Sequence, residues 1–465
     1  MALGRRQDAH QELWIATTDL PKSPGHVFYR KLNQLLAEIG FDPWLEDLCR
    51  PYYAEKKGRP SIPPGVYFRM ILVGYFEGIS SQRGIAWRCC DSRSLGEFLG
   101  FGAAEETPDH SSLTRVHQRL PLEVHVDMFQ KVLAAAAEKG LLKGRTVAVD
   151  STTLEANAAM KSIERRDTGE DWEAYLRRLA GEAGLVNPSA EDLRRFDKNR
   201  SDKKVSNEEW FSPSDPDAKI ARMKDGTTHL AYKAEHVIDV ETELVLAAEI
   251  YEANQADVHT LCDSVMAAQT NLHEIESEAQ IKEVVADKGY HSADTLELAD
   301  ALDLRTYIPE PQRKKKDKKK SQSKTEPKSA DHERAVRNNR RRTSTEKGKR
   351  LQRERSEKVE RSFAHVCETG GARRVWLWGI EKVRKRYLMQ ACARNLGLIM
   401  RALFGMGTPR GLQSEGGEAS EGVFGVFCLI QLAWIPSRSA LAGLMTHLRH
   451  SALASGSHAS PLLAA

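Results

Sequence analysis

The chain has 465 residues, of which 40% are hydrophobic and 29% are charged, and its formal net charge is +4. This length exceeds what one core usually holds and the composition is that of a globular protein, which excludes a lone small module, a disordered chain and a fibrous protein. The seven cysteines form no Cys-x-x-Cys pair, the N-terminus has no apolar stretch of signal-peptide length, and no apolar run is long enough to span a membrane. We therefore expect reduced thiols, a cytoplasmic location and no membrane partner.

Residues 26–140 are expected to form an all-helical domain behind an N-terminal extension, residues 1–25. Apolar residues recur at helical spacing, beginning with Phe28, Leu32 and Leu35. Residues 66–76 are almost entirely apolar, and a Pro-rich turn precedes them, which predicts a buried central helix.

A series of strands and helices is predicted after Gly140. The expected elements are strand 145–150, a hairpin of strands 229–240 and 244–250, helix 254–268, strand 281–286, helix 292–301, strand 304–308 and a helical stretch over 353–400. This order predicts a mixed α/β domain over residues 141–400. A polar insert over about 156–226 and a basic insert over about 311–352 interrupt it. Residues 401–465 form a tail of unknown role.

Positive charge is concentrated in one segment of the chain. Residues 313–361 contain 21 Lys or Arg and 8 Asp or Glu, so this segment is at +13 and the remainder at −9. Such a segment attracts polyanions, so nucleic acid is the first partner to consider, with a solvated or disordered tract as the alternative. The candidate DNA-contacting residues are Arg313, Lys314, Lys315, Lys316, Lys318, Lys319, Lys320, Arg340, Arg341, Arg342, Arg355 and Arg361.

Acidic residues follow two of the predicted strands and also occur in a later helix. Asp150 and Asp287 each come at the end of an apolar strand, and carboxylates at the ends of neighbouring strands converge on one crevice. Such hard oxygen ligands suit Mg²⁺ or Mn²⁺, although Asp also caps turns, so a structural role is the alternative. Glu360 lies beside the apolar stripe that contains Val359 and Phe363, so it could reach inward or remain an exposed, paired acid.

These segments together resemble the DDE transposases of bacterial insertion sequences, over roughly residues 26–400. The likeness rests on Asp150 followed by Ser-Thr, on Asp287 within Ala-Asp-Lys-Gly-Tyr, and on Glu360 within Val-Glu-Arg-x-Phe. The resemblance implies an all-helical N-terminal domain that recognises DNA ends, followed by an RNase H-like mixed sheet flanked by helices. It also implies that the three acids hold two Mg²⁺ or Mn²⁺ ions and form the catalytic centre.

The resemblance further implies metal-dependent cleavage at the ends of a mobile element and transfer of the 3′-OH into target DNA. The expected partners are terminal inverted repeats, target DNA and a second copy of the chain on DNA, in a bacterial cytoplasm at the nucleoid. Two alternatives stay open, namely an inactive descendant that only binds DNA and a nuclease that cuts without joining. Relatives often carry Tyr, Arg and Lys around the third acid, where this chain has Arg353, Ser356 and Cys367.

Overall fold

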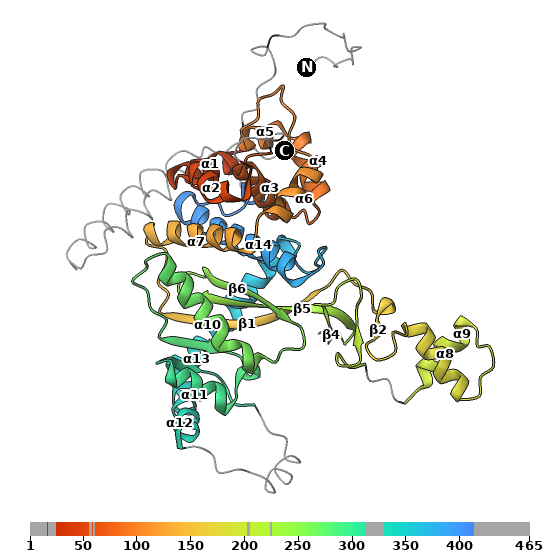
Figure 1. Cartoon of the computed structure of the whole chain (residues 1–465). Helices are drawn as coiled ribbons and strands as arrows, with labels where there is room; N and C mark the ends of the chain where they lie inside the picture. The colour runs from red at the N-terminus through yellow and green to blue at the C-terminus, as the bar shows by residue number, and fades with distance from the viewer. Residues whose placement is uncertain are drawn as a thin grey trace, which may run out of the picture. The chain divides into compact units, whose positions relative to one another are not determined.

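The computed structural model describes residue 16 and residues 25–54, 58, 61–201, 205–223, 226–311 and 330–412. The described residues up to Gly411 belong to one compact unit (Figure 1). Most of the predicted N-terminal extension and of the predicted tail lies outside the described residues.

The first part of the chain is helical, as predicted. Its α-helices are α1 (Val27–Glu38), α2 (Phe41–Cys49), α3 (Pro64–Glu77), α4 (Gln82–Asp91), α5 (Arg93–Leu99), α6 (His110–Arg119) and α7 (Leu122–Glu138). The apolar α3 is buried along almost its whole length, which makes it the central helix. Pro64 fixes the backbone for its first turn, and Gly78 ends it with a φ of 71°, a conformation that favours glycine.

The second part is built on a six-stranded mixed sheet. Its strands are β1 (Thr146–Glu155), β4 (Lys219–Arg222), β5 (Thr228–Asp239), β6 (Val245–Glu252), β7 (Glu283–Ala286) and β8 (Arg305–Tyr307). They lie in the order β4-β5-β1-β7-β8, and β6 also pairs with β5. β5 runs antiparallel to β1, whereas β7 runs parallel to β1 and β8 parallel to β7. This arrangement confirms the predicted mixed α/β class.

Helices cover both faces of this sheet. On one face, α10 (Asp257–Glu274) receives Lys233 of β5, whose ammonium donates to the Thr260 hydroxyl. The other face is covered by α13 (Glu346–Phe363) and α14 (Ile380–Phe404), and Tyr387 of α14 hydrogen-bonds His236 of β5. Since α14 also packs against α3 and α7, one hydrophobic core continues from the helices into the sheet. Two further helices, α11 (Ala293–Ala301) and α12 (Ala330–Ser344), pack together beside β8.

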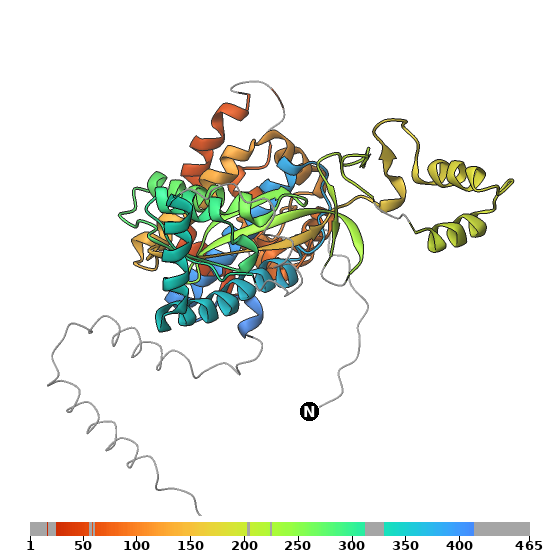
Figure 2. The ribbon, with the colours of Figure 1, turned by 90° about the horizontal axis from the view of Figure 1, so that it is seen from below.

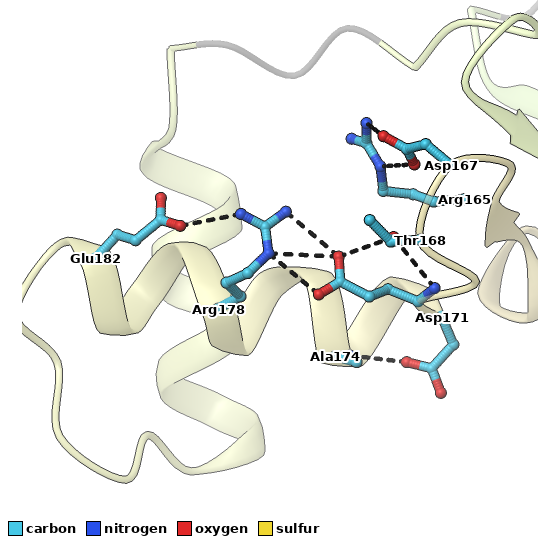
Figure 3. Close-up of polar contacts among 8 residues, drawn as sticks. Arg165, Asp167, Thr168, Asp171, Ala174, Arg178 and Glu182 are labelled. Carbon is cyan, nitrogen blue, oxygen red and sulfur yellow. Dashed lines mark hydrogen bonds and ion pairs between the residues drawn. The ribbon is translucent and has the colours of Figure 1, made fainter.

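The range predicted as a polar insert contains a small subdomain that extends away from the sheet in both views (Figures 1 and 2). It consists of α8 (Trp172–Glu182), α9 (Ala190–Asn199) and a short sheet of β2 (Glu164–Arg165) and β3 (Trp210–Phe211). Ion pairs on its surface include Arg178 between Glu170 and Glu182 (Figure 3). The last part of that range is β4, which joins the main sheet.

Several elements differ from the sequence prediction. Predicted helix 254–268 is α10, which continues to Glu274, and the helical stretch predicted over 353–400 is interrupted by the non-helical residues 370–379. We expected the first strand to end at Asp150, but β1 continues to Glu155, because these residues keep pairing with β5 after the pairing with β7 has stopped at Val149. The range predicted as a basic insert is partly helical, since it contains α12 and the start of α13 at Glu346.

The buried Asn395 side chain fastens α14 to β6. Its carbonyl oxygen accepts from the Val245 N–H at 2.9 Å, and its amide donates to the Val245 C=O at 2.8 Å. Asn395→Ala leaves both buried groups unpaired, so we expect it to lower the free energy of unfolding by about 2–4 kcal/mol. Urea unfolding measures this loss. The exposed Asn199→Ala is the control, and equal stability of the two variants would contradict this role for Asn395.

Candidate active site

Parallel pairing of β1 and β7 brings Asp150 and Asp287 together. The last paired residues are Val149 and Ala286, and the aspartates are the next residues on these neighbouring strands. Burial raises the pKa of Asp150 above its ordinary value, and the negative charge of Asp287 raises it further. The strand register therefore places the two carboxylates at the same end of neighbouring strands.

Arg355 of α13 is the direct partner of Asp150. Its Nη1 donates to Asp150 Oδ2 at 2.7 Å, and the Arg355 side chain is 11% exposed. This guanidinium, together with the Ser151 N–H that donates to Asp150 Oδ1 at 2.8 Å, opposes the rise in the Asp150 pKa. Arg355 is a DNA contact predicted from the sequence, whereas in this structure its charge is directed at Asp150.

Glu360 lies on α13, but the structure does not bring it into contact with the two aspartates. Its side chain is exposed and accepts from the Ser356 hydroxyl at 3.2 Å. Residues four apart share one side of a helix, so Gln352, Ser356 and Glu360 follow one another along α13. Gln352 donates to the Ala286 carbonyl, directly before Asp287, so this side of the helix begins at the aspartate pair.

A buried polar network supports both aspartates from the opposite face of the sheet. Beside Asp150, the Ser151 hydroxyl donates to Asp257 at 3.1 Å. Three residues after Asp287, the hydroxyl of the buried Tyr290 donates to Glu235 at 2.8 Å. Lys233 links the two acids of this network, at 2.8 Å from Asp257 Oδ1 and 3.5 Å from Glu235 Oε2. The pattern of strands and helices gave no signal for this network.

The donor chemistry of the aspartate pair suits a divalent cation. Each Asp150 oxygen has one protein partner, and Asp287 Oδ1 accepts from the Lys288 N–H, so both carboxylates keep acceptor capacity. Among the described residues, no group of three or more His, Cys, Asp or Glu side chains is arranged to hold a metal ion. The structure therefore brings together two of the three acids expected from the sequence.

The predicted DNA contacts fall into three groups. Arg313, Lys314, Lys315, Lys316, Lys318, Lys319 and Lys320 lie outside the described residues. In α12, Arg340 pairs with Glu310, Arg342 donates to the backbone and hydroxyl of Thr306, and Arg341 is exposed. Arg361 pairs with Glu243 and Glu357.

Comparisons with known proteins agree with this architecture. A model of the transposase DDE domain matches residues 142–396, which is more than half of the chain, and a model of a transposase domain of the DUF772 type matches residues 18–119. The chain belongs to the DDE transposase family. Searches of curated proteins and of solved structures each gave no match.

As a member of this family, the chain is a DNA transposase of the insertion-sequence type with an RNase H-like catalytic domain. It is therefore an enzyme that acts on DNA. Transposases of this family generally use divalent metal ions, which agrees with the carboxylate chemistry at the ends of the β1–β7 pairing. In the part of the transposase that the structure describes, no helix is long and apolar enough to cross a membrane.

The Arg355–Asp150 pair predicts a pH-dependent loss of stability. Arg355→Met leaves a mostly buried carboxylate without its cation, so we expect the free energy of unfolding to fall by about 1–3 kcal/mol at pH 7. A carboxyl whose folded-state pKa is raised stabilises the fold fully below its ordinary pKa and loses this contribution as pH rises through the raised pKa. Arg355→Met raises the Asp150 pKa further, so the difference from the wild type should shrink towards pH 4.

Denaturant unfolding at several pH values measures this difference. Arg353→Met, an exposed arginine on the same helix, is the matched control and should leave stability within about 0.5 kcal/mol of the wild type. If the free energy of unfolding of Arg355→Met is lower than that of the wild type by the same amount from pH 4 to pH 7, Arg355 acts through packing and not through the charge of Asp150.

Proposed function

We propose that this transposase cleaves DNA at the ends of a mobile element in a metal-dependent reaction and transfers the resulting 3′-OH into target DNA. The observation that carries the proposal is the adjacency of Asp150 and Asp287 at the end of the β1–β7 pairing, in a chain of the DDE family. We assign Glu360 as the third acid, and the proposed partners are terminal inverted repeats and target DNA. Because two element ends have to be joined, we extend the proposal to a homodimer on DNA.

The three acids would hold two Mg²⁺ or Mn²⁺ ions. When bound, such ions supply the Lewis acidity that activates a water or a 3′-OH and that stabilises charge on the attacking and leaving oxygens. The oxygens of Asp150 and Asp287 that retain acceptor capacity support this assignment. The hard oxygen ligands of these side chains match the preference of both ions.

The residues of the chain have separate tasks in this proposal. Asp150, held by Arg355 and by the Ser151 N–H, presents a carboxylate whose position is fixed from two sides. Asp287 lies beside it on the next strand, and its loop is fastened by the buried Tyr290. Because the hydroxyl of Tyr290 is buried and donates to Glu235, we assign this tyrosine a packing role and no nucleophilic one.

Charge-neutral substitutions of the three acids test the proposal. Asp150→Asn, Asp287→Asn and Glu360→Gln should each reduce nicking of DNA that carries the element's ends by more than about 100-fold, since outer partners of metal ligands alone account for 10–100-fold effects. Nicking of a plasmid with the sequences that flank the coding region, in Mg²⁺ or Mn²⁺, is the measurement.

Glu357→Gln is the matched control for Glu360, because Glu357 is an exposed acid one turn earlier on α13 and pairs with Arg361. It should retain nicking close to the wild-type rate. Equal nicking by Asp287→Asn and the wild type would refute the proposed centre. Loss of nicking in Glu357→Gln with activity kept in Glu360→Gln would move the third acid to Glu357.

A further inference from the structure

We propose that residues 373–378 form a platform on which unpaired DNA bases stack. The platform lies beside β1, the β-strand that carries Asp150. This segment, which we name the tryptophan platform, connects the end of α13 and its π-helical extension to α14. The inference rests on the proposed function, because it assumes that DNA lies at Asp150 and Asp287.

The platform contains two exposed indoles. Trp376 is 49% exposed and Trp378 is 53% exposed, whereas Val375 is buried and Leu377 packs against the core. The backbone bends at Leu377, and the two tryptophans on either side of it are both exposed. Exposed indoles are uncommon because tryptophan is highly buried on average. A pair of them in one short segment therefore calls for a ligand with a flat apolar face.

The platform is fastened to β1 by hydrogen bonds. The Val375 N–H donates to the Glu155 C=O at 2.8 Å, and the indole N–H of Trp378 donates to the Asn157 C=O at 2.7 Å. In return the Asn157 side chain donates to the Trp376 C=O at 3.3 Å. These bonds hold one edge of the Trp378 indole and leave its faces uncovered by them. A fixed aromatic surface binds a flat partner at low entropic cost.

Cations accompany the indoles. The Arg374 guanidinium lies 4.9 Å from the centre of the Trp376 ring, and the Arg373 side chain is 48% exposed. Each arginine has an acidic neighbour, Glu155 for Arg374 and Glu368 for Arg373. Aromatic rings beside cations are the combination with which proteins bind single-stranded nucleic acid, because the rings stack on bases and the cations contact phosphates.

The position of the platform points to DNA as its occupant. Arg373 donates to the hydroxyl of Thr152, which lies two residues after Asp150 and on the same face of β1. At about 3.3 Å per residue, Thr152 is roughly 7 Å and Glu155 roughly 17 Å along the strand from Asp150. The second distance is about five nucleotides at the 3.4 Å axial spacing of one strand of B-DNA.

The chemistry favours unpaired bases over a duplex. In a duplex each base face is already stacked on its neighbours, so an indole can stack only on a terminal, flipped or unpaired base. A strand end released by the proposed cleavage would present a terminal base of this kind beside the acids. The platform would therefore hold the unpaired strand next to the acids and fix its direction.

Binding of fluorescein-labelled dT12, compared with a 12-base-pair duplex, tests the platform in the full chain. Trp376→Ala and Trp378→Ala should each weaken dT12 binding about tenfold and leave duplex binding nearly unchanged, as measured by anisotropy. Trp376→Phe and Trp378→Phe should restore most of the affinity, since they keep a ring without the indole N–H. Trp87→Ala removes an indole that is 65% exposed on α4 and is the matched control for dT12 binding.

The outcomes separate the platform from the proposed function. Trp-dependent dT12 binding supports the platform even if Asp287→Asn nicks DNA like the wild type and the catalytic proposal therefore fails. Unchanged dT12 binding in both alanine variants overturns the platform. So does a change of oligomeric state in the alanine variants without DNA, since the indoles would then face a protein partner.

Discussion

The parallel pairing of β1 with β7 is the constraint on which the candidate site depends. Because Val149 pairs with Ala286, the next residue on each strand is an aspartate, and the two acids meet although 136 residues separate them in sequence. A slip of one residue would turn one aspartate to the opposite face of the sheet, towards α10. The register is held by Lys347, which reaches the buried Glu283 at the start of β7 while Thr146 of β1 donates to the same carboxylate.

The extension of β1 beyond Asp150 determines the surroundings of this carboxylate. Asp150 is paired with His236 of β5 on one side and is free of strand pairing on the other, so it lies at an internal step of the sheet. A carboxylate at such a step is mostly buried, which raises its pKa, so a nearby cation stabilises its charged form. Arg355 supplies that cation. The same extension carries Glu155, to which the tryptophan platform is fastened.

The sequence predicted the elements better than it predicted the contacts. Strands such as β5 and β7 are rich in β-branched or aromatic residues, so their existence could be predicted, and the two aspartates follow from their places after apolar runs. The length of β1 could not, because the Ser-Thr-Thr that follows Asp150 has no alternating pattern and pairs only through β5. The Arg355–Asp150 pair joins residues 205 apart, and only the tertiary fold decides which of many arginines reaches the acid. The sequence contains the Trp-x-Trp pattern of the platform after Arg-Arg, but it does not predict that both tryptophans are exposed.

Charge explains why α13 brings a cation to the strand-borne pair and keeps its acid Glu360 away from it. Asp150 and Asp287 side by side repel each other, and Arg355 reduces this repulsion. Glu360, five residues further along the helix, is kept away from the pair and stays in solvent, where its own charge costs little. A third carboxylate close to two others would destabilise the fold unless a cation of higher charge were present to balance all three. In the proposed centre, placing the third acid on a helix, and not on a strand within the sheet, would let the fold form before the full ligand set is assembled.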